Sequence, residues 1–203
     1  MLACMSISTE PVVDVAVRDR HDHAPCDSRI NGVVIRPLTR HGDSRGGFIE
    51  TYRQEWFDGP VMVQGNRSDS AAGTIRGLHF HRTQSDYWLC LHGTLLVCVH
   101  DARPSSPTEG VTQGIVLDSS TNAGVYIPPG VAHGFAALED STLTYLVDNY
   151  YDGDDEFGVS WNDPAVAMDW GISSPILSDR DMSCPTIAEL RAAGTLPAAW
   201  GTT

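Results

Sequence analysis

The sequence predicts an all-β fold, a sandwich or barrel of short strands, and three observations support this prediction. Short runs of apolar or alternating residues recur at roughly regular spacing beyond residue 31. Segments rich in Gly, Pro, Ser and Asp separate these runs, as at residues 41–47 and 103–110. Helical periodicity is sparse by comparison.

The expected strands follow one another along the chain between these turns. They are residues 32–37, 48–53, 61–64, 87–92, 95–100, 114–117, 124–127 and 143–149. Because neighbouring side chains of a strand point to opposite faces, we expect Leu95, Val97 and Val99 to share one face. One helix is expected at residues 186–193, since Pro185 precedes it and Gly194 follows it.

The length of the chain favours a single domain. Its 203 residues, 41% of them hydrophobic, suffice for one substantial core but hardly for two. We assign this domain to residues 31–203. Residues 1–30 mix Asp, Arg, His and Pro with little periodicity, and we expect them to form a flexible N-terminal leader.

The charge of the chain restricts its partners and its chemistry. A formal net charge of −13 argues against non-specific binding to nucleic acid or to an anionic membrane. All 13 basic residues are arginine and none is lysine. This excludes Schiff-base catalysis and any proton transfer by a lysine.

Cysteine usage and hydropathy favour a cytoplasmic protein. The 5 cysteines are widely spaced and form no CxxC pair, so neither a disulfide framework nor a zinc knuckle is indicated. No apolar run approaches the roughly 18 residues of a membrane span, and the N-terminus lacks the basic and apolar regions of a signal peptide. We therefore expect a reducing cytoplasm and no membrane contact.

Histidines are the residues best suited to carry chemistry here. His79 and His81 are two residues apart on an expected strand and so share a face. His133 follows a Pro-Gly turn that would bring it to the same cavity, and Tyr145 adds a phenol that can donate or accept a proton. Such a cluster fits either an acid/base site or a metal site.

Several motifs occur in a fixed order over about residues 32–190. They are DSRGGFIE at 43–50, QGNRS at 64–68, RGLHF at 76–80, SPT at 106–108, IPPGVAHGF at 127–135, DNYY at 148–151, WNDP at 161–164 and PILSDRD at 175–181. In these motifs the chain resembles the dTDP-4-dehydrorhamnose 3,5-epimerases. The resemblance implies a jelly-roll (cupin, double-stranded β-helix) fold with a few short helices.

The resemblance also implies a reaction and its catalytic residues. His79 is expected to be the base, Asp181 the carboxylate that orients its imidazole, and Tyr145 the acid on the opposite side. A proton next to a ketone can be removed by a base if the enolate oxygen is stabilised, and an acid on the other face then completes the inversion. We expect an isomerase that inverts C3, C5 or both of a dTDP-linked 4-keto-6-deoxyhexose in deoxysugar biosynthesis, without a cofactor or metal.

A second set of residues is implied to bind the substrate. Its members are Arg76 and His133 near the diphosphate or sugar, Gln64 and Asn66 at the nucleotide, Arg45, Phe48 and Glu50 reaching into a neighbouring subunit, and Tyr150 and Arg180. Arginine suits a diphosphate because its planar guanidinium makes bidentate contacts. We expect a homodimer, since exchange of the strand at 48–53 would cover an exposed sheet edge.

Two positions depart from the family's pattern. The family usually has a lysine, thought to stabilise the enolate, where this chain has Asp86, and commonly a glutamine where it has His81. A carboxylate opposes enolate charge unless it is protonated or turned away. Two alternatives follow: a metal-dependent cupin enzyme using His79, His81 and His133 with Gln84 or Asp86, or a non-catalytic module that binds sugar nucleotides.

Overall fold

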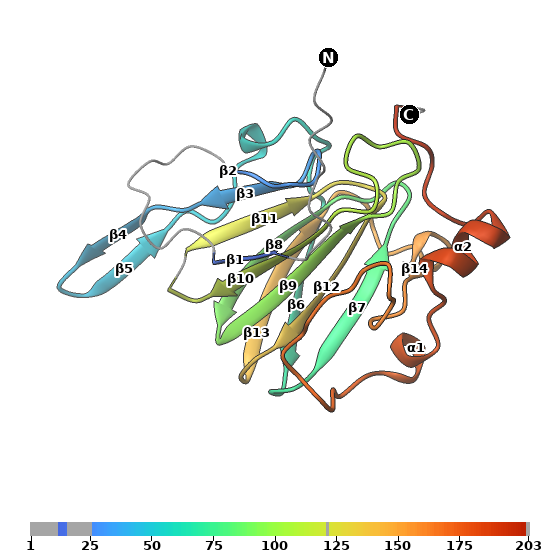
Figure 1. Cartoon of the computed structure of the whole chain (residues 1–203). Helices are drawn as coiled ribbons and strands as arrows, with labels where there is room; N and C mark the ends of the chain where they lie inside the picture. The colour runs from blue at the N-terminus through green and yellow to red at the C-terminus, as the bar shows by residue number, and fades with distance from the viewer. Residues whose placement is uncertain (1–11, 16–25, 121, 202–203) are drawn as a thin grey trace, which may run out of the picture.

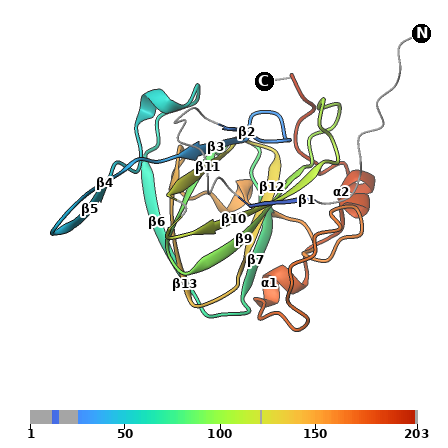
Figure 2. The same cartoon turned by 60° about the vertical axis from the view of Figure 1, so that its left-hand side comes forward.

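Two six-stranded sheets face each other and enclose the core (Figures 1 and 2). The computed structural model describes residues 12–15, 26–120 and 122–201. Within these residues the secondary structure is mostly strand, with short helices near the C-terminus. The predicted all-β jelly-roll class is confirmed.

The first sheet has the order β1-β10-β9-β12-β7-β14. Its strands are Val12–Val15 (β1), Thr112–Asp118 (β10), Thr94–Asp101 (β9), Val131–Ala137 (β12), Ile75–Phe80 (β7) and Phe157–Gly158 (β14). β1 pairs with β10 in parallel, and the other pairs are antiparallel.

The second sheet has the order β2-β3-β11-β8-β13-β6 and is antiparallel. Its strands are Cys26–Asp27 (β2), Val34–Pro37 (β3), Ala123–Ile127 (β11), Asp86–His92 (β8), Ser141–Val147 (β13) and Gln64–Ser70 (β6). A hairpin of Arg40–Asp43 (β4) and Gly46–Ile49 (β5) projects away from both sheets (Figure 1).

Alternation along the strands divides the apolar side chains between layers. Leu95, Val97 and Val99 of β9 face the space between the sheets, as predicted, and pack there with Val125 and Leu143. The intervening Leu96 and Cys98 of β9 face outward and pack under the C-terminal segment. Side chains on the two faces of one strand thus fill two separate apolar layers.

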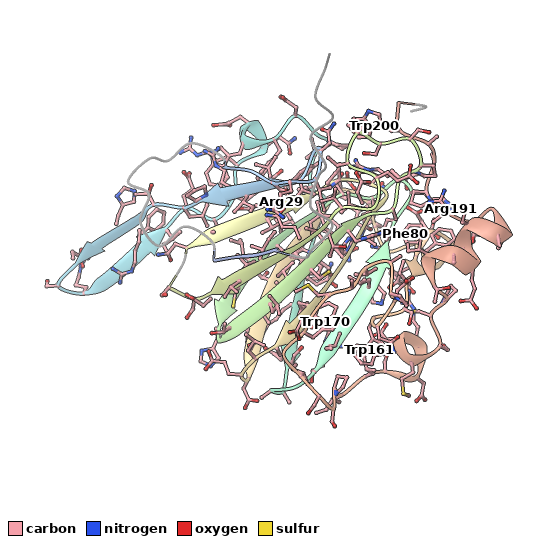
Figure 3. All side chains as sticks on the ribbon, in the orientation of Figure 1. Arg29, Phe80, Trp161, Trp170, Arg191 and Trp200 are labelled. Atoms are coloured by element: carbon pink, nitrogen blue, oxygen red, sulfur yellow. The ribbon has the colours of Figure 1, made fainter. Side chains whose placement is uncertain are left out.

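The C-terminal segment covers the outer face of the first sheet. It contains the short helices Asp179–Met182 (α1) and Ile187–Ala193 (α2), on the right in Figure 1. α2 is the predicted helix: the Thr186 hydroxyl accepts the N–H of Glu189 at its start, and Gly194 ends it at φ 67°. Figure 3 shows Trp161 and Trp170 at this layer, where Trp170 is buried.

Other element boundaries differ from the prediction. The turn expected at 41–47 is the β4–β5 hairpin, and the strand expected at 48–53 ends at Ile49. The strand expected at 61–64 is misplaced, since β6 begins at Gln64 and continues to Ser70. The sequence of β6 is polar, so no apolar pattern indicated this strand. Most of the predicted 1–30 leader lies outside the described residues and stays a prediction, although β1 and β2 belong to it. No described helix has the length and apolar character to cross a bilayer.

A buried ion pair fixes the turn that follows β9. Arg103 donates from Nε to Oδ1 of Asp101 at 2.7 Å and from a terminal nitrogen to Oδ2 at 2.8 Å. The hydroxyls of Ser106 and Thr108 each donate to Oδ2 at 2.6 Å. Burial alone would raise the pKa of Asp101, but the hydrogen bonds from these side chains hold it below its ordinary value of 3.8.

Replacing Asp101 with Asn should therefore lower the free energy of unfolding by about 3–5 kcal/mol, because the Arg103 charge remains buried without its partner. Urea unfolding at fixed protein concentration measures this loss. The wild-type contribution is complete above about pH 4 and falls below it, since the pKa of Asp101 is depressed in the folded state.

The matched control is Asp43→Asn on the exposed hairpin. Asp43 pairs with Arg45 at 2.6 Å, but both side chains are largely in water. This variant should unfold like the wild type. Equal unfolding curves for the Asp101 and Asp43 variants would contradict the structural importance of the buried pair.

Candidate active site

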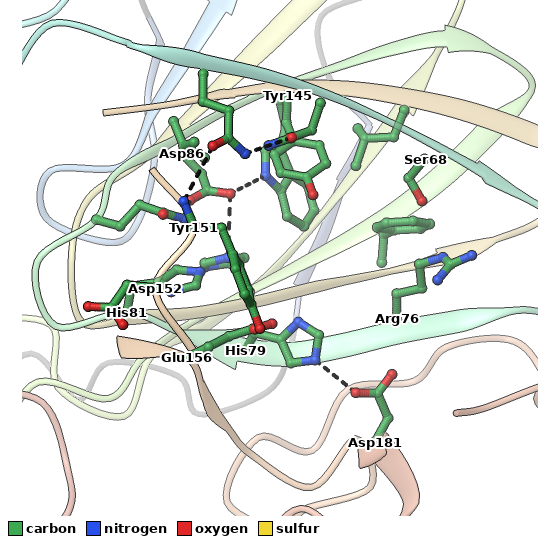
Figure 4. Close-up of a pocket in the computed structure, with 18 of the residues that line it drawn as sticks. Ser68, Arg76, His79, His81, Asp86, Tyr145, Tyr151, Asp152, Glu156 and Asp181 are labelled. Carbon is green, nitrogen blue, oxygen red and sulfur yellow. Dashed lines mark hydrogen bonds and ion pairs between the residues drawn. The ribbon is translucent and has the colours of Figure 1, made fainter. Parts of the chain in front are cut away.

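One cavity of about 490 Å³ lies between the two sheets at the end where the C-terminal segment crosses. Figure 4 shows it with His79 and Asp181 below and Tyr145 above. Its walls come from β6, β7, β8, β12 and β13 and from the segments around Glu156 and Arg180. The cavity thus collects side chains from most of the chain.

His79 and Asp181 form a hydrogen-bonded pair on the cavity wall. His79 Nε2 lies 2.8 Å from Asp181 Oδ1, and the carboxylate is almost fully buried. Burial alone would raise the pKa of Asp181, but the His79 hydrogen bond and charge, helped by Ser178 and the Gly77 N–H, hold it below its ordinary value. An ionised Asp181 fixes the Nε2–H tautomer of His79 and leaves Nδ1 as the proton acceptor.

A β-bulge brings Arg76 and His79 to the same side of β7. His133 of β12 pairs with His79, whereas Phe135 pairs with Arg76, so the register shifts between the two pairs. The bulge requires Gly77, which has φ 111° and whose added Cβ would lie 2.7 Å from the Gly134 Cα atom. Arg76 and His79 are three residues apart and still both line the cavity.

Tyr145 enters the cavity from the opposite sheet. It lies on β13 between Asn66 of β6 and Trp88 of β8, and its ring is 6.4 Å from the Trp88 ring. Burial raises the pKa of the phenol above 10.0, and the carboxylates of Asp86 and Glu156 raise it further. Tyr145 is therefore protonated near neutral pH and can act as an acid.

His81, His133 and Asp86 form a second group in the cavity, with His133 on the first sheet and Asp86 on the second. One ligand atom from each lies within 4.8 Å of the others, a spacing from which a metal ion could be held. Burial lowers the pKa of His133 to about 4, against the opposing effect of Asp86, so the imidazole is neutral at pH 7. The alternative hypothesis of a metal site included His79 as a ligand. His79 is instead hydrogen-bonded to Asp181 and lies outside this group.

Four residues of the predicted substrate-binding set line the cavity besides His133: Gln64, Asn66, Arg76 and Arg180. Gln64 donates to Asn66 Oδ1 at 2.9 Å, and Arg76 donates to Ser70 Oγ at 2.9 Å. Arg180 pairs with Glu156 at the mouth. Arg76 and Arg180 place two guanidinium groups beside the cavity.

The other four predicted residues lie away from the cavity of this chain. Arg45, Phe48 and Glu50 are on or beside the β4–β5 hairpin, where Phe48 is 67% exposed. Glu50 pairs with Arg53 at 2.7 Å. Tyr150 is exposed, and the neighbouring Tyr151 lines the cavity in its place.

Several residues that line the cavity were not predicted from the sequence. They are Ser68, Trp88, Phe135, Leu143, Val147, Tyr151, Asp152, Glu156 and Ser178. Strand alternation could have identified some of them, because Ser68 follows Asn66 by two positions and Leu143 precedes Tyr145 by two. Glu156 and Ser178 lie in irregular segments, for which no such rule exists.

Known proteins match this chain over most of its length. Residues 27–189 match the family described as dTDP-4-dehydrorhamnose 3,5-epimerase. A dTDP-4-dehydrorhamnose 3-epimerase of Streptomyces niveus is 38% identical over 177 residues, which cover 83% of this chain and 86% of the relative.

Solved structures agree with this match. NovW, a 4-keto-6-deoxy sugar epimerase from the novobiocin cluster of Streptomyces spheroides, superposes with a TM-score of 0.83 at 36% identity, covering 90% of this chain and 96% of NovW. ChmJ, a 3'-monoepimerase of Streptomyces bikiniensis in complex with dTDP-quinovose, superposes with a TM-score of 0.79 at 34% identity, covering 83% and 90%. By sequence and by fold, the chain belongs to the dTDP-4-dehydrorhamnose 3,5-epimerase family.

Proposed function

We propose that this chain is an epimerase that inverts C3, C5 or both of a dTDP-linked 4-keto-6-deoxyhexose, in deoxysugar biosynthesis. The observation that carries the proposal is the position of an oriented base and a protonated phenol on opposite sheets around one cavity. A sugar ring lying between the sheets would present one face to His79 and the other to Tyr145.

His79 is the base in this reaction. Its Nδ1 takes the proton from the carbon next to the C4 ketone, and the electron pair of the broken C–H bond moves onto the ketone oxygen. The resulting imidazolium is stabilised by Asp181, which lies 2.8 Å from Nε2. The sugar is then a planar enolate that can accept a proton on either face.

Tyr145 supplies the proton for inversion. Its hydroxyl protonates the same carbon from the opposite face, and the enolate electrons re-form the ketone. The tyrosinate then recovers a proton from solvent, and the imidazolium of His79 releases its proton to solvent. No atom is gained or lost overall, so substrate and product differ only in configuration.

Arginines at the cavity suit the diphosphate of the substrate. Arg76 and Arg180 are the guanidinium groups that line the cavity, and bidentate arginine contacts are strong ligands for phosphate. Gln64 and Asn66 lie on β6, where they line the cavity and offer amide groups for the nucleotide base. These roles follow the family resemblance and the position of each side chain.

The β4–β5 hairpin fits a role in a homodimer. It extends from the body with Phe48 exposed, and Arg45 and Phe48 lie away from the cavity of their own chain (Figure 1). We place this hairpin over the site of a partner subunit, where Arg45, Phe48 and Glu50 complete the substrate pocket. A cytoplasmic location accords with the free thiols of Cys90, Cys98 and Cys184.

The proposed reaction predicts hydrogen exchange at defined carbons. With dTDP-4-keto-6-deoxyglucose in heavy water, the wild-type chain should introduce deuterium at C3, C5 or both, because each turnover returns a solvent proton. NMR of the sugar measures exchange and identifies the carbon. A bound sugar nucleotide without exchange at either carbon would instead indicate a non-catalytic binding module.

Variants of His79 and Tyr145 should separate the two proton transfers. His79→Asn should lower both exchange and epimerisation by about 10²–10⁴-fold, because the base is lost. Tyr145→Phe should lower epimerisation by a similar factor while deuterium still enters with retained configuration, since His79 can return the proton from its own face.

His92→Asn is the matched control for these variants. His92 is an exposed residue at the end of β8 and does not line the cavity, so its loss should leave kcat unchanged. Full epimerisation by the Tyr145→Phe variant would show that another group is the acid.

Mixing two inactive variants tests whether subunits share a site. Suppose Arg45→Ala and His79→Asn chains are unfolded together and refolded. Each heterodimer then has one site with an intact His79 and an intact partner hairpin. Activity should reappear in the mixture.

The matched mixture is His79→Asn with Tyr145→Phe. Both residues belong to the cavity of their own chain, so each heterodimer has two defective sites and activity stays low. Sedimentation confirms the dimer in both mixtures. A mixture of Arg45→Ala and His79→Asn chains that is no more active than its separate components would contradict a shared site.

A further inference from the structure

Three electron-pair donors converge at one side of the cavity, from both sheets. His81, His133 and Asp86 each offer a ligand atom, and these atoms lie within 4.8 Å of one another. The His133 Nε2 atom is 3.9 Å from Asp86 Oδ2, too far for a hydrogen bond. Figure 4 shows His81 and Asp86 on the same side of the cavity, away from Arg76.

Backbone carbonyls fix the tautomer of both imidazoles. His81 Nδ1 lies 2.9 Å from the Asp155 carbonyl oxygen, and His133 Nδ1 lies 2.9 Å from the Val131 carbonyl oxygen. A carbonyl only accepts, so each Nδ1 carries the hydrogen and each Nε2 keeps its lone pair. A carbonyl that accepts the other ring N–H and fixes the tautomer in this way is typical of metal-binding histidines.

Asp86 is held in place by two donors of its own. The Gln84 side chain donates to Oδ1 at 3.0 Å, and the Trp88 indole N–H donates to Oδ2 at 2.9 Å. Asp86 is nevertheless buried, and within the described residues no arginine forms an ion pair with it; the imidazole of His133 lies 3.9 Å away. A buried carboxylate that faces two imidazole lone pairs is stabilised by a cation placed between them.

We propose that His81, His133 and Asp86 bind one divalent transition-metal ion, of the class of Zn²⁺, Fe²⁺ or Mn²⁺. Two imidazoles and one carboxylate suit these ions, whereas Mg²⁺ and Ca²⁺ prefer oxygen ligands alone. Bonds of about 2.0–2.2 Å place neighbouring ligand atoms roughly 3–3.6 Å apart, so His133 and Asp86, at 3.9 Å, must move slightly closer to share an ion. His81, the partly exposed member of the group, must also move toward them.

The position of this site also gives the ion a role, and this role rests on the proposed epimerase function. His133 is the cross-strand partner of His79, so one ligand of the ion lies beside the base, while Asp86 reaches the ion from the second sheet. An ion there has open positions toward the cavity, and the C4 oxygen of the sugar can fill one of them. The ion would then stabilise the enolate that His79 generates.

Metal binding is measured on the untagged full-length chain without any sugar. The protein is dialysed against a chelator, loaded with Zn²⁺ or Co²⁺, and analysed by mass spectrometry of the metal and by the visible absorption of bound Co²⁺. We expect one ion per chain. His81→Gln and Asp86→Asn should each weaken binding by more than the roughly 10–100-fold that loss of a residue behind a ligand costs.

The control variant is His92→Gln, which removes an exposed histidine from the same strand as Asp86 and should bind metal like the wild type. Circular dichroism checks that every variant is folded. Metal content far below one ion per chain would overturn the proposed site. Equal affinity in the wild type and His81→Gln would also overturn it, because the ion would then be bound elsewhere, for example by the cysteine thiols.

Deuterium exchange with and without the ion separates this inference from the proposed function. Stoichiometric metal with no exchange in either form would support the site and overturn the epimerase function. Faster exchange in the loaded form would support both. Equal exchange rates in the two forms would overturn the role assigned to the ion at the enolate.

Discussion

The hydrogen bond between His79 and Asp181 is the constraint on which the rest of the site depends. It joins residues 102 positions apart, one on β7 and the other in the short helix α1. For the two to meet, β7 must bulge at Gly77 and lie against Gly134, where any side chain would collide with backbone. The C-terminal segment must also pack on the outer face of the first sheet, through an apolar layer that includes Leu78, Val159 and Leu190. Folding of the outer layer therefore sets the tautomer of the His79 imidazole.

Two facing sheets can place side chains on opposite sides of a bound substrate, whereas a single sheet cannot. Inversion at carbon requires a base and an acid on opposite faces of the substrate, and neighbouring strands of one sheet place their side chains on a common face. Here His79 belongs to the first sheet and Tyr145 to the second, with the cavity between them. Burial raises the pKa of the phenol, while the buried carboxylate orients the imidazole. The jelly roll thus places the proposed acid and the proposed base on opposite sides of one cavity.

The success of sequence reasoning followed the strength of the local patterns. Alternating apolar residues correctly predicted the inward face of β9, and the Pro185–Gly194 frame correctly predicted α2. Most of β6 was not predicted because its residues are polar, although Gln64, Asn66 and Ser68 line the cavity in register with β13. The bulge at Gly77 also has no signature in strand periodicity, since it arises from contact with Gly134. Pairing of distant segments determines such features, and a single sequence records it only weakly.

The two departures from the family's pattern are best understood as one change. Where the family usually has a lysine, Asp86 alone would place a negative charge beside an enolate that is already negative, and the reaction would slow. His81 and His133 alter this balance because both direct a lone pair toward the carboxylate. A divalent ion bound by the three residues leaves one net positive charge, the same sign and size as the charge of the missing lysine. A chain without any lysine can in this way recover the electrostatic stabilisation of the enolate, but only if both substitutions are present together. Asp86 by itself opposes the reaction, whereas Asp86 with His81 and His133 provides a site for the cation that supports it.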